Sequence, residues 1–214
     1  MPIFHSTVYS LHRISGVDLH LWQLTESLDN LCILLSDRSL LLREPYVSFK
    51  SEKRKREWVA VRVLLEEVAQ QPLSICYKSS GKPYLTPGIA EFSVSHTKDV
   101  VGIVMSQQPV GMDVEQKGPR PLKLISQFVH TDDYQPTNVC FAELMAAYMW
   151  SAKESVYKLL GVPGIELLSD IRLVPSKVGE EYTEFMAYVQ RVGKTALVRC
   201  YSYPTFVLTI ATYA

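Results

Sequence analysis

The sequence is poor in cysteine and glycine and carries no net charge. Its 214 residues include four cysteines and ten glycines, and 22 Lys and Arg balance 22 Asp and Glu. Proteins that bind nucleic acids generally carry a basic excess that contacts the phosphates. The balanced charge therefore argues against a nucleic-acid partner.

The cysteines are too few and too scattered to organise the fold. Cys32, Cys76, Cys140 and Cys200 form no CxxC pair, and none has a histidine at the spacing of zinc ligands. Four cysteines in a chain of this length also do not suggest a disulfide framework. We expect neither a structural zinc site nor a disulfide scaffold.

Long apolar runs are absent as well. No stretch approaches the roughly 20 apolar residues that a membrane-spanning helix needs. The opening segment, residues 1–5, lacks a basic region followed by an apolar one, so we expect no secretory signal. Hydrophobic residues make up 47% of the chain, enough for a sizeable core. A cytoplasmic enzyme with no membrane partner is the expectation.

Hydrophobic periodicity predicts a mixed α+β fold. Apolar residues at helical spacing indicate long helices over 51–70 and about 141–160, and a leucine-rich helix over 26–42. Strands are expected over 92–96, 100–105 and 110–115, with three or four more between 171 and 213. Because each half offers one long helix and several strands, we expect two lobes, 1–106 and 107–214.

The segment Gly111-Met112-Asp113-Val114-Glu115 places two acids on one face of a strand, because side chains two residues apart point the same way. Such close carboxylates repel each other unless a cation lies between them. Mg²⁺ takes one or two carboxylates and completes its coordination shell with water and phosphate. A solvent-facing strand with no metal is the common alternative for this pattern.

The second candidate segment runs from Trp150 to Lys158 on the predicted second long helix. Trp150, Glu154 and Lys158 follow one another at i, i+4 steps, away from the apolar stripe, and Lys153 lies nearby. An exposed Glu–Lys pair would explain the charges without any function. The large aromatic side chain of Trp150 instead suggests that something covers this face.

Two further groups are candidate functional residues, and the second of them suggests anion binding. Ser95 and His96 end a predicted strand, where functional side chains often gather, although a lone histidine is more often structural. The basic run 53–56 opens the first long helix, where cations oppose the helix dipole. A bound phosphate would relieve that conflict, so this run joins Arg62 and Lys82 as a candidate anion site, with a solvated charged face as the alternative.

Together these segments resemble the 4′-phosphopantetheinyl transferases, specifically the two-lobed monomeric type that activates peptide and polyketide synthetases. The family's (I/V)SH, G(V/I)D(V/I)E and WxxKExxxK signatures correspond to residues 94–96, 111–115 and 150–158, and its GKP to 81–83. The resemblance covers roughly residues 50–165 in detail. It implies two similar lobes with pseudo-twofold symmetry, each a long helix packed on a small sheet.

The resemblance also implies an activity. Enzymes of this family move 4′-phosphopantetheine from coenzyme A to a serine of an acyl or peptidyl carrier protein and release 3′,5′-ADP, with Mg²⁺ or Mn²⁺ as the metal. Asp113, Glu115 and Glu154 match the metal-binding acids, and Glu154 also matches the proposed general base. The residues matched to coenzyme A phosphate contacts, or to lysines near the pyrophosphate, are Arg56, Arg62, Lys82, Ser95, His96, Lys153 and Lys158.

The match is incomplete at its margins. The family's N-terminal lysines near the 3′-phosphate have no counterpart before residue 45, although Arg38 or Arg43 is a substitute, and the loop 130–133 has Asp where the family has Glu. A non-catalytic coenzyme A or carrier-binding module remains an alternative, as does another coenzyme A-dependent transferase. An acyltransferase would need a glycine-rich pyrophosphate loop that this chain lacks. For carrier docking we expect the basic patch Lys117, Arg120 and Lys123.

Overall fold

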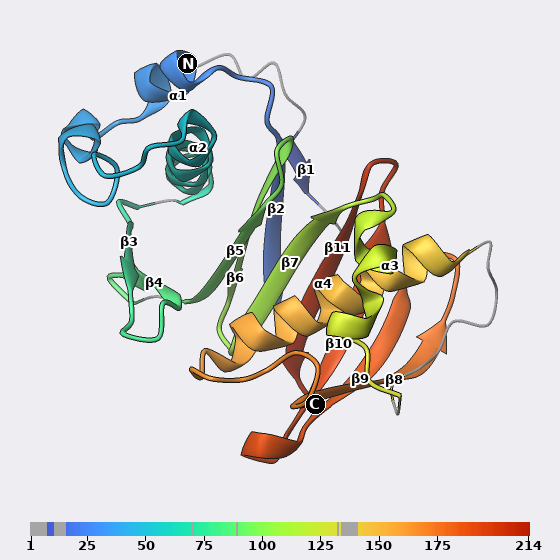
Figure 1. The fold of residues 1–214 in the computed structure, drawn as a ribbon. Helices are drawn as coiled ribbons and strands as arrows, with labels where there is room; N and C mark the ends of the chain where they lie inside the picture. Colours follow the sequence, from blue (N-terminus) through green and yellow to red (C-terminus); the bar gives the residue numbers. More distant parts are fainter. Residues whose placement is uncertain (1–7, 11–15, 70, 89, 132, 134–140) are drawn as a thin grey trace.

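The computed structural model describes residues 8–10, 16–69, 71–88, 90–131, 133 and 141–214 (Figure 1). The segment 1–5, Asp132 and Cys140 lie outside these ranges, so the expectations that concern them stay untested. Cys32, Cys76 and Cys200 are free thiols. In the part of the chain that is described, no helix has both the length and the apolar character to cross a membrane.

The first half of the chain forms a four-stranded antiparallel sheet of order β1-β2-β6-β5, with α1 and α2 beside it (Figure 1). Strands β3 and β4 pair with each other as a separate two-stranded sheet. In chain order the elements are β1 (Val8–Ser10), β2 (Val17–Gln23), α1 (Leu28–Leu34), a 3₁₀ helix (Arg38–Leu42), α2 (Glu52–Val68), β3 (Ser74–Tyr77), β4 (Pro83–Thr86), β5 (Glu91–His96) and β6 (Val100–Ser106).

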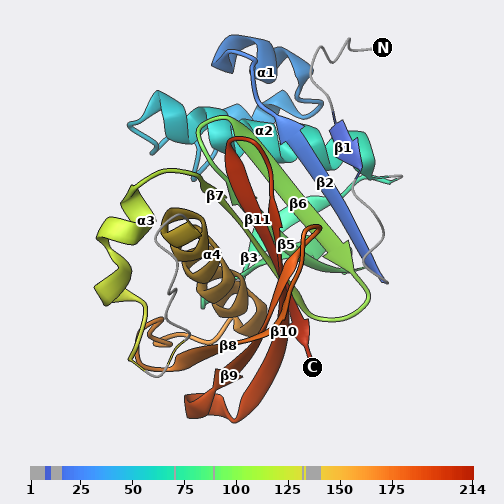
Figure 2. The same cartoon turned by 90° about the vertical axis from the view of Figure 1, so that its right-hand side faces the viewer.

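The second half forms a five-stranded antiparallel sheet of order β7-β11-β10-β9-β8, and the long helix α4 lies across one face of it (Figures 1 and 2). Its main elements are β7 (Val110–Gln116), α3 (Arg120–Lys123), α4 (Ala142–Leu160), β8 (Ile171–Val178), β9 (Thr183–Val189), β10 (Lys194–Ser202) and β11 (Phe206–Tyr213). Short 3₁₀ helices span Ile125–Gln127 and Gln190–Val192. This mixed architecture confirms the predicted α+β class.

Three apolar clusters hold these layers together. One lies between α2, α1 and the first sheet, and includes Trp22, Leu64 and Ile103. The second lies between α4 and the second sheet. The third joins the two sheets, where residues of β2 and β6 meet Met112 of β7 and residues of β11. Strand β7 is therefore covered on both faces, so the solvent-facing alternative for its acids is wrong.

Gly111 allows α4 to lie directly on β7. A Cβ at this position would overlap the carbonyl oxygen of Ser155 and approach within 2.5 Å of the amide nitrogen of Leu159, both in the helix backbone. A helix backbone cannot move aside as a flexible side chain can. The glycine thus sets how closely α4 approaches the acids of β7.

Most element predictions are confirmed within a few residues, including both long helices and four strands after residue 171. The helical segment predicted over 26–42 is confirmed in part, because it is divided into α1 and a 3₁₀ helix. Leu35 has extended backbone angles that end α1, and Asp37 caps the following 3₁₀ helix by accepting a hydrogen bond from the Ser39 amide. The local capping chemistry divides a leucine-rich segment that periodicity alone reads as one helix.

Candidate active site

Asp113 is the centre of a polar cluster between the two sheets and α4. Its Oδ1 accepts hydrogen bonds from Ser95 Oγ at 2.8 Å and from Lys158 Nζ at 2.7 Å, and its Oδ2 accepts one from Ser151 Oγ at 2.9 Å. Lys158 Nζ also donates to Ser95 Oγ at 3.0 Å. The cluster therefore draws together β5, β7 and α4, which carry three separate motifs of the sequence.

The serines of β5 share one strand face, and that face lies against β7. Ser93 Oγ accepts a hydrogen bond from the Met112 amide at 3.0 Å, two residues before Ser95 donates to Asp113. Both serines are buried. These two contacts tie the first half of the chain to the second at the position of the acids.

Ser151 connects the cluster to β11. Its hydroxyl lies 2.9 Å from Thr209 Oγ1 of β11, and Thr209 Oγ1 donates to the Ser151 carbonyl at 2.8 Å. Both side chains are fully buried. The sequence analysis missed this pair. Serine is a weak helix former, so its presence inside a long helix was the feature that could have pointed to Ser151.

The other two acids lie close enough to Asp113 to feel its charge. Burial raises the pKa of Glu115, and the Asp113 charge raises it further, while Arg120 and a hydrogen bond from Trp150 act in the opposite direction. Burial also raises the pKa of Glu154, followed by the Asp113 charge, with Lys158 lowering it. Mutual repulsion among the acids is the condition under which a bound cation is stabilising.

The donor set of these acids fits a divalent cation. Carboxylate oxygens are the ligands that Mg²⁺ and Mn²⁺ accept in proteins. Within the described ranges, however, no three His, Cys, Asp or Glu side chains form a ready metal-binding cluster. The Lys158 ammonium lies on Asp113 and supplies the compensating positive charge there.

A cavity of about 340 Å³ opens beside this cluster. Its lining includes Glu154, Tyr157 and Lys158 of α4, together with Lys82 and Val94 from the first half of the chain. Lys82 Nζ donates to the Leu159 carbonyl at 2.7 Å, near the end of α4, and burial lowers the pKa of Lys82. Lys82, Lys158 and Glu154 thus line one cavity, although Lys82 is far from the other two in the sequence.

Gly161 lets Lys82 reach the end of α4. Its backbone is left-handed, with φ of 59°, and its amide caps the helix by donating to the Tyr157 carbonyl. A Cβ at this position would overlap the side chain of Lys82. The glycine therefore both ends the helix and makes room for the lysine.

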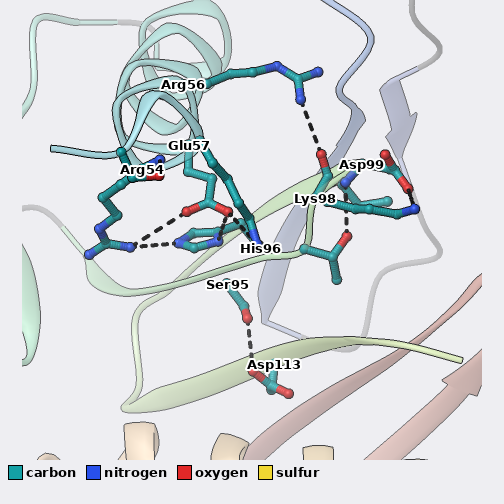
Figure 3. Close-up of polar contacts among 12 residues, drawn as sticks. Arg54, Arg56, Glu57, Ser95, His96, Lys98, Asp99 and Asp113 are labelled. Atoms are coloured by element: carbon teal, nitrogen blue, oxygen red, sulfur yellow. Dashed lines mark hydrogen bonds and ion pairs between the residues drawn. The ribbon is translucent and has the colours of Figure 1, made fainter. Parts of the chain in front are cut away.

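His96 belongs to a charged group at the start of α2 (Figure 3). Its Nδ1 lies 3.5 Å from Glu57 Oε1, and its Nε2 lies 3.2 Å from an Arg54 guanidinium nitrogen. Burial lowers the pKa of His96, and the Glu57 charge opposes that effect. The basic run predicted as an anion site therefore reaches His96 through Arg54, while Glu57 is an acid that the sequence analysis missed.

Comparison with known proteins identifies the same elements. Residues 109–210 match the model of the 4′-phosphopantetheinyl transferase superfamily. This part of the chain is therefore similar to that superfamily. The chain is 32% identical over 111 residues to the 4′-phosphopantetheinyl transferase psf-1 of Bacillus pumilus, and 34% identical over 89 residues to the 4′-phosphopantetheinyl transferase gsp of Aneurinibacillus migulanus.

These matches are partial. They cover 48% and 38% of this chain, and 47% and 35% of the two relatives, so the matched part spans about half of each relative or less. The superfamily match includes β7 and α4, which carry Asp113, Glu115, Glu154 and Lys158.

Not every site residue predicted from the sequence lies at the cluster. Lys153 is completely buried, and its Nζ donates to Asp133 Oδ2 at 2.6 Å and to the Leu167 carbonyl at 3.0 Å. Asp133 in turn accepts from the amides of His130 and Leu173. In this arrangement Lys153 holds the loop before α4, and its predicted pyrophosphate contact stays a prediction without support from the geometry.

The two arginines of α2 also have other partners. Arg56 donates to the carbonyls of Leu24 and Glu26, at 3.0 and 2.7 Å, and so ties α2 to the segment after β2. The Arg62 guanidinium lies 3.3 Å over the Trp58 ring and donates to the Trp58 carbonyl. Their predicted contacts with coenzyme A phosphates stay predictions, because neither side chain lines the cavity beside Asp113.

Trp150 is covered by the chain itself. Its ring packs edge-on against Phe128 with centroids 5.1 Å apart, and it hydrogen-bonds to Glu115. The inference that something covers this face of α4 is confirmed, and the covering group is an internal aromatic side chain. Trp150 thereby helps to fix Glu115.

Proposed function

We propose that this protein transfers the 4′-phosphopantetheine group of coenzyme A to a serine of an acyl or peptidyl carrier protein. The proposal rests on the match of residues 109–210 to the superfamily model and on the two similar proteins, which are both named 4′-phosphopantetheinyl transferases. The observation that carries it is the convergence at Asp113 of Ser95, Lys158 and the repelling acids Glu115 and Glu154. A cavity able to hold part of a phosphate-bearing substrate adjoins them.

In the proposed reaction the Oγ of the carrier serine attacks the β-phosphorus of coenzyme A and forms the new P–O bond. The P–O bond to the α-phosphate breaks, and 3′,5′-ADP leaves. Glu154 takes the proton of the serine, directly or through a water molecule. Burial and the neighbouring Asp113 charge raise the pKa of this glutamate. Lys158 and Lys82, which both line the cavity, would bind the phosphate oxygens.

We further propose that Asp113, Glu115 and Glu154 bind Mg²⁺, with Mn²⁺ as the alternative. The acids provide hard oxygen donors, and their raised pKa values reflect a repulsion that a cation would relieve. When bound, the ion would offset negative charge that develops on the phosphate oxygens. Lys158 would then exchange Asp113 for a substrate phosphate, because both are anions within reach of one flexible side chain.

The architecture behind this site is proposed to be two similar lobes, 1–106 and 107–214, related by pseudo-twofold symmetry. Each half contains an antiparallel sheet and one long helix, α2 or α4. In this view the first lobe contributes Lys82, Ser95 and His96 to coenzyme A, and the second contributes the acids and Lys158. Function as a cytoplasmic monomer with no nucleic-acid or membrane partner stays a prediction from the sequence.

Carrier docking is proposed at the basic patch of Lys117, Arg120 and Lys123. Arg120 and Lys123 lie on α3, beside the strand that carries the acids, and Lys117 donates to Ser202 Oγ. Carrier proteins are acidic, so reversing these three charges should raise the Michaelis constant for the carrier at low salt. An unchanged constant would exclude the patch.

The decisive experiment is incubation with coenzyme A, Mg²⁺ and several apo carrier proteins, read by intact mass. A gain of one phosphopantetheine group on a carrier is the expected result. Binding of coenzyme A with no mass gain would indicate the non-catalytic module, and transfer of an acyl group alone would indicate a different coenzyme A-dependent transferase.

A further inference from the structure

The imidazole of His96 is held between two side chains of α2 (Figure 3). Glu57 approaches its Nδ1 at 3.5 Å, and Arg54 approaches its Nε2 at 3.2 Å. Glu57 is 7% exposed, although it carries a charge. Its carboxylate is also 3.7 Å from Lys53 Nζ and 3.8 Å from an Arg54 nitrogen.

These contacts define the tautomer of the ring. A guanidinium only donates hydrogen bonds, so Nε2 must accept from Arg54. In a neutral imidazole the proton then lies on Nδ1, facing the Glu57 carboxylate. The opposite tautomer would direct a lone pair at Glu57 and an N–H at Arg54, so both contacts would be repulsive.

We propose that Glu57 is a positioning residue that fixes the Nδ1–H of His96, so that Nε2 is the nitrogen presented to a phosphate group of coenzyme A. This inference rests on the proposed function. Arg54 leaves Nε2 when the phosphate arrives and pairs with that anion. Arg54 belongs to the basic run that suggested an anion site, whereas Glu57 belongs to none of the motifs that suggested the site.

The arrangement couples binding to uptake of a proton. A phosphate oxygen accepts hydrogen bonds, so Nε2 must carry a proton to donate to it. With Nδ1–H on Glu57, the ring in the complex is an imidazolium whose charge Glu57 offsets. The charged groups acting on the ring are Glu57, Arg54 and Lys53 from α2, and Lys158 from α4.

The direction of the pH dependence follows from these groups. Burial, together with Arg54, Lys158 and Lys53, lowers the pKa of His96, so the ring is neutral at neutral pH before binding. A bound phosphate raises that pKa. Affinity for coenzyme A therefore falls as pH rises between the two pKa values, by at most about tenfold per pH unit.

The first test measures coenzyme A binding by calorimetry at about pH 7.5, in two buffers with different ionisation enthalpies. At that pH a phosphomonoester, with a second pKa near 6, is already ionised, so a proton taken up goes to the protein. The parent should take up more than about half a proton. Glu57→Gln should weaken affinity about tenfold and reduce the uptake, because imidazolium loses a counter-charge worth about one pKa unit.

Matched variants separate positioning from general charge effects. Glu57→Asp keeps the carboxylate and should restore part of the proton uptake. Glu67→Gln removes the same charge from an exposed position on the same helix and should bind as the parent does. Parental affinity and proton uptake in Glu57→Gln would overturn the proposal.

The second test needs no stable variant at Glu57. The side-chain ¹⁵N resonances of His96, assigned by their loss in His96→Gln, report the tautomer directly. We expect a protonated Nδ1 and an unprotonated Nε2 in the parent, and protons on both nitrogens after coenzyme A is added. A proton on Nε2 alone before addition would refute the proposal. If the parent binds no coenzyme A at all, the proposed function fails, and the tautomer still decides the role of Glu57.

Discussion

Replacement of Gly111 by alanine tests the contact on which the whole site depends. The added methyl group would overlap the Ser155 carbonyl and lie 2.5 Å from the Leu159 amide nitrogen. Overpacking of this kind costs typically 1–3 kcal/mol. Because both obstructing atoms belong to the backbone of α4, we expect the upper end, about 3 kcal/mol.

This destabilisation translates into a measurable shift in melting temperature. In a chain of this size 1 kcal/mol corresponds to about 2–4 °C, so Gly111→Ala should melt roughly 6–12 °C lower than the parent. Gly88→Ala is the matched control. A Cβ at Gly88 would meet only the Leu85 carbonyl, at an ordinary 3.8 Å, so this variant should melt close to the parent.

The catalytic effect should exceed the loss of folded protein. Helix α4 carries Glu154 and Lys158, and relief of the overlap must move it away from Asp113. A displacement of about 1 Å in a positioned group can reduce the rate about 10²-fold. Turnover at saturating coenzyme A and carrier, measured well below the melting transition, should fall accordingly. Parental turnover and melting in Gly111→Ala would refute the argument that this glycine sets the distance between helix and acids.

Three further predictions concern the charged groups. Glu154→Gln should lower the transfer rate by about 10²- to 10⁴-fold and introduce a dependence on magnesium concentration. Lys158→Ala should lower turnover without that dependence. Near-parental activity of Glu154→Gln at saturating magnesium would show that Glu154 is not the base. The pKa values of Glu115 and Glu154 are raised in the folded state, so the folded protein binds protons at these acids more tightly than the unfolded chain does. The two acids therefore lower the free energy of unfolding increasingly as pH rises through their folded-state pKa values. Glu115→Gln should therefore raise the melting temperature at pH 7 more than at pH 4, and an equal shift at both would contradict this. Lys153→Met should cost about 3–5 kcal/mol in urea unfolding because it leaves Asp133 buried without its cation; unchanged stability with lost transfer would instead assign Lys153 to the chemistry.

The predictions from sequence succeeded where local pattern determines structure. Alternation over β5 and β7, and helical periodicity over α2 and α4, located these elements within a few residues. The same alternation correctly placed Asp113 and Glu115 on one face, opposite Met112. Sequence alone could not show that both faces of β7 are covered, because the packing of α4 and β6 against β7 depends on contacts between distant segments.

The partners of individual charges were less predictable. Arg56 looked free to bind phosphate, yet it donates to the carbonyls of Leu24 and Glu26, roughly thirty residues earlier. Glu57 adjoins it in sequence and meets His96, which is 39 positions away. Backbone carbonyls leave no mark in a sequence pattern, so a basic run cannot reveal which of its members are already engaged.

Adjacent residues of α4 show the same limit most directly. Lys153 and Glu154 stand side by side in one motif, yet about 100° of helical rotation separates their side chains. Lys153 points into the protein and pairs with Asp133, while Glu154 lines the cavity and feels the charge of Asp113. Lys158, one turn after Glu154, shares its direction and reaches Asp113, and Ser151, one turn before Glu154, reaches it as well. A nine-residue motif therefore combines a residue that holds the fold, Lys153, with others that form or support the site, and their partners rather than their spacing distinguish them.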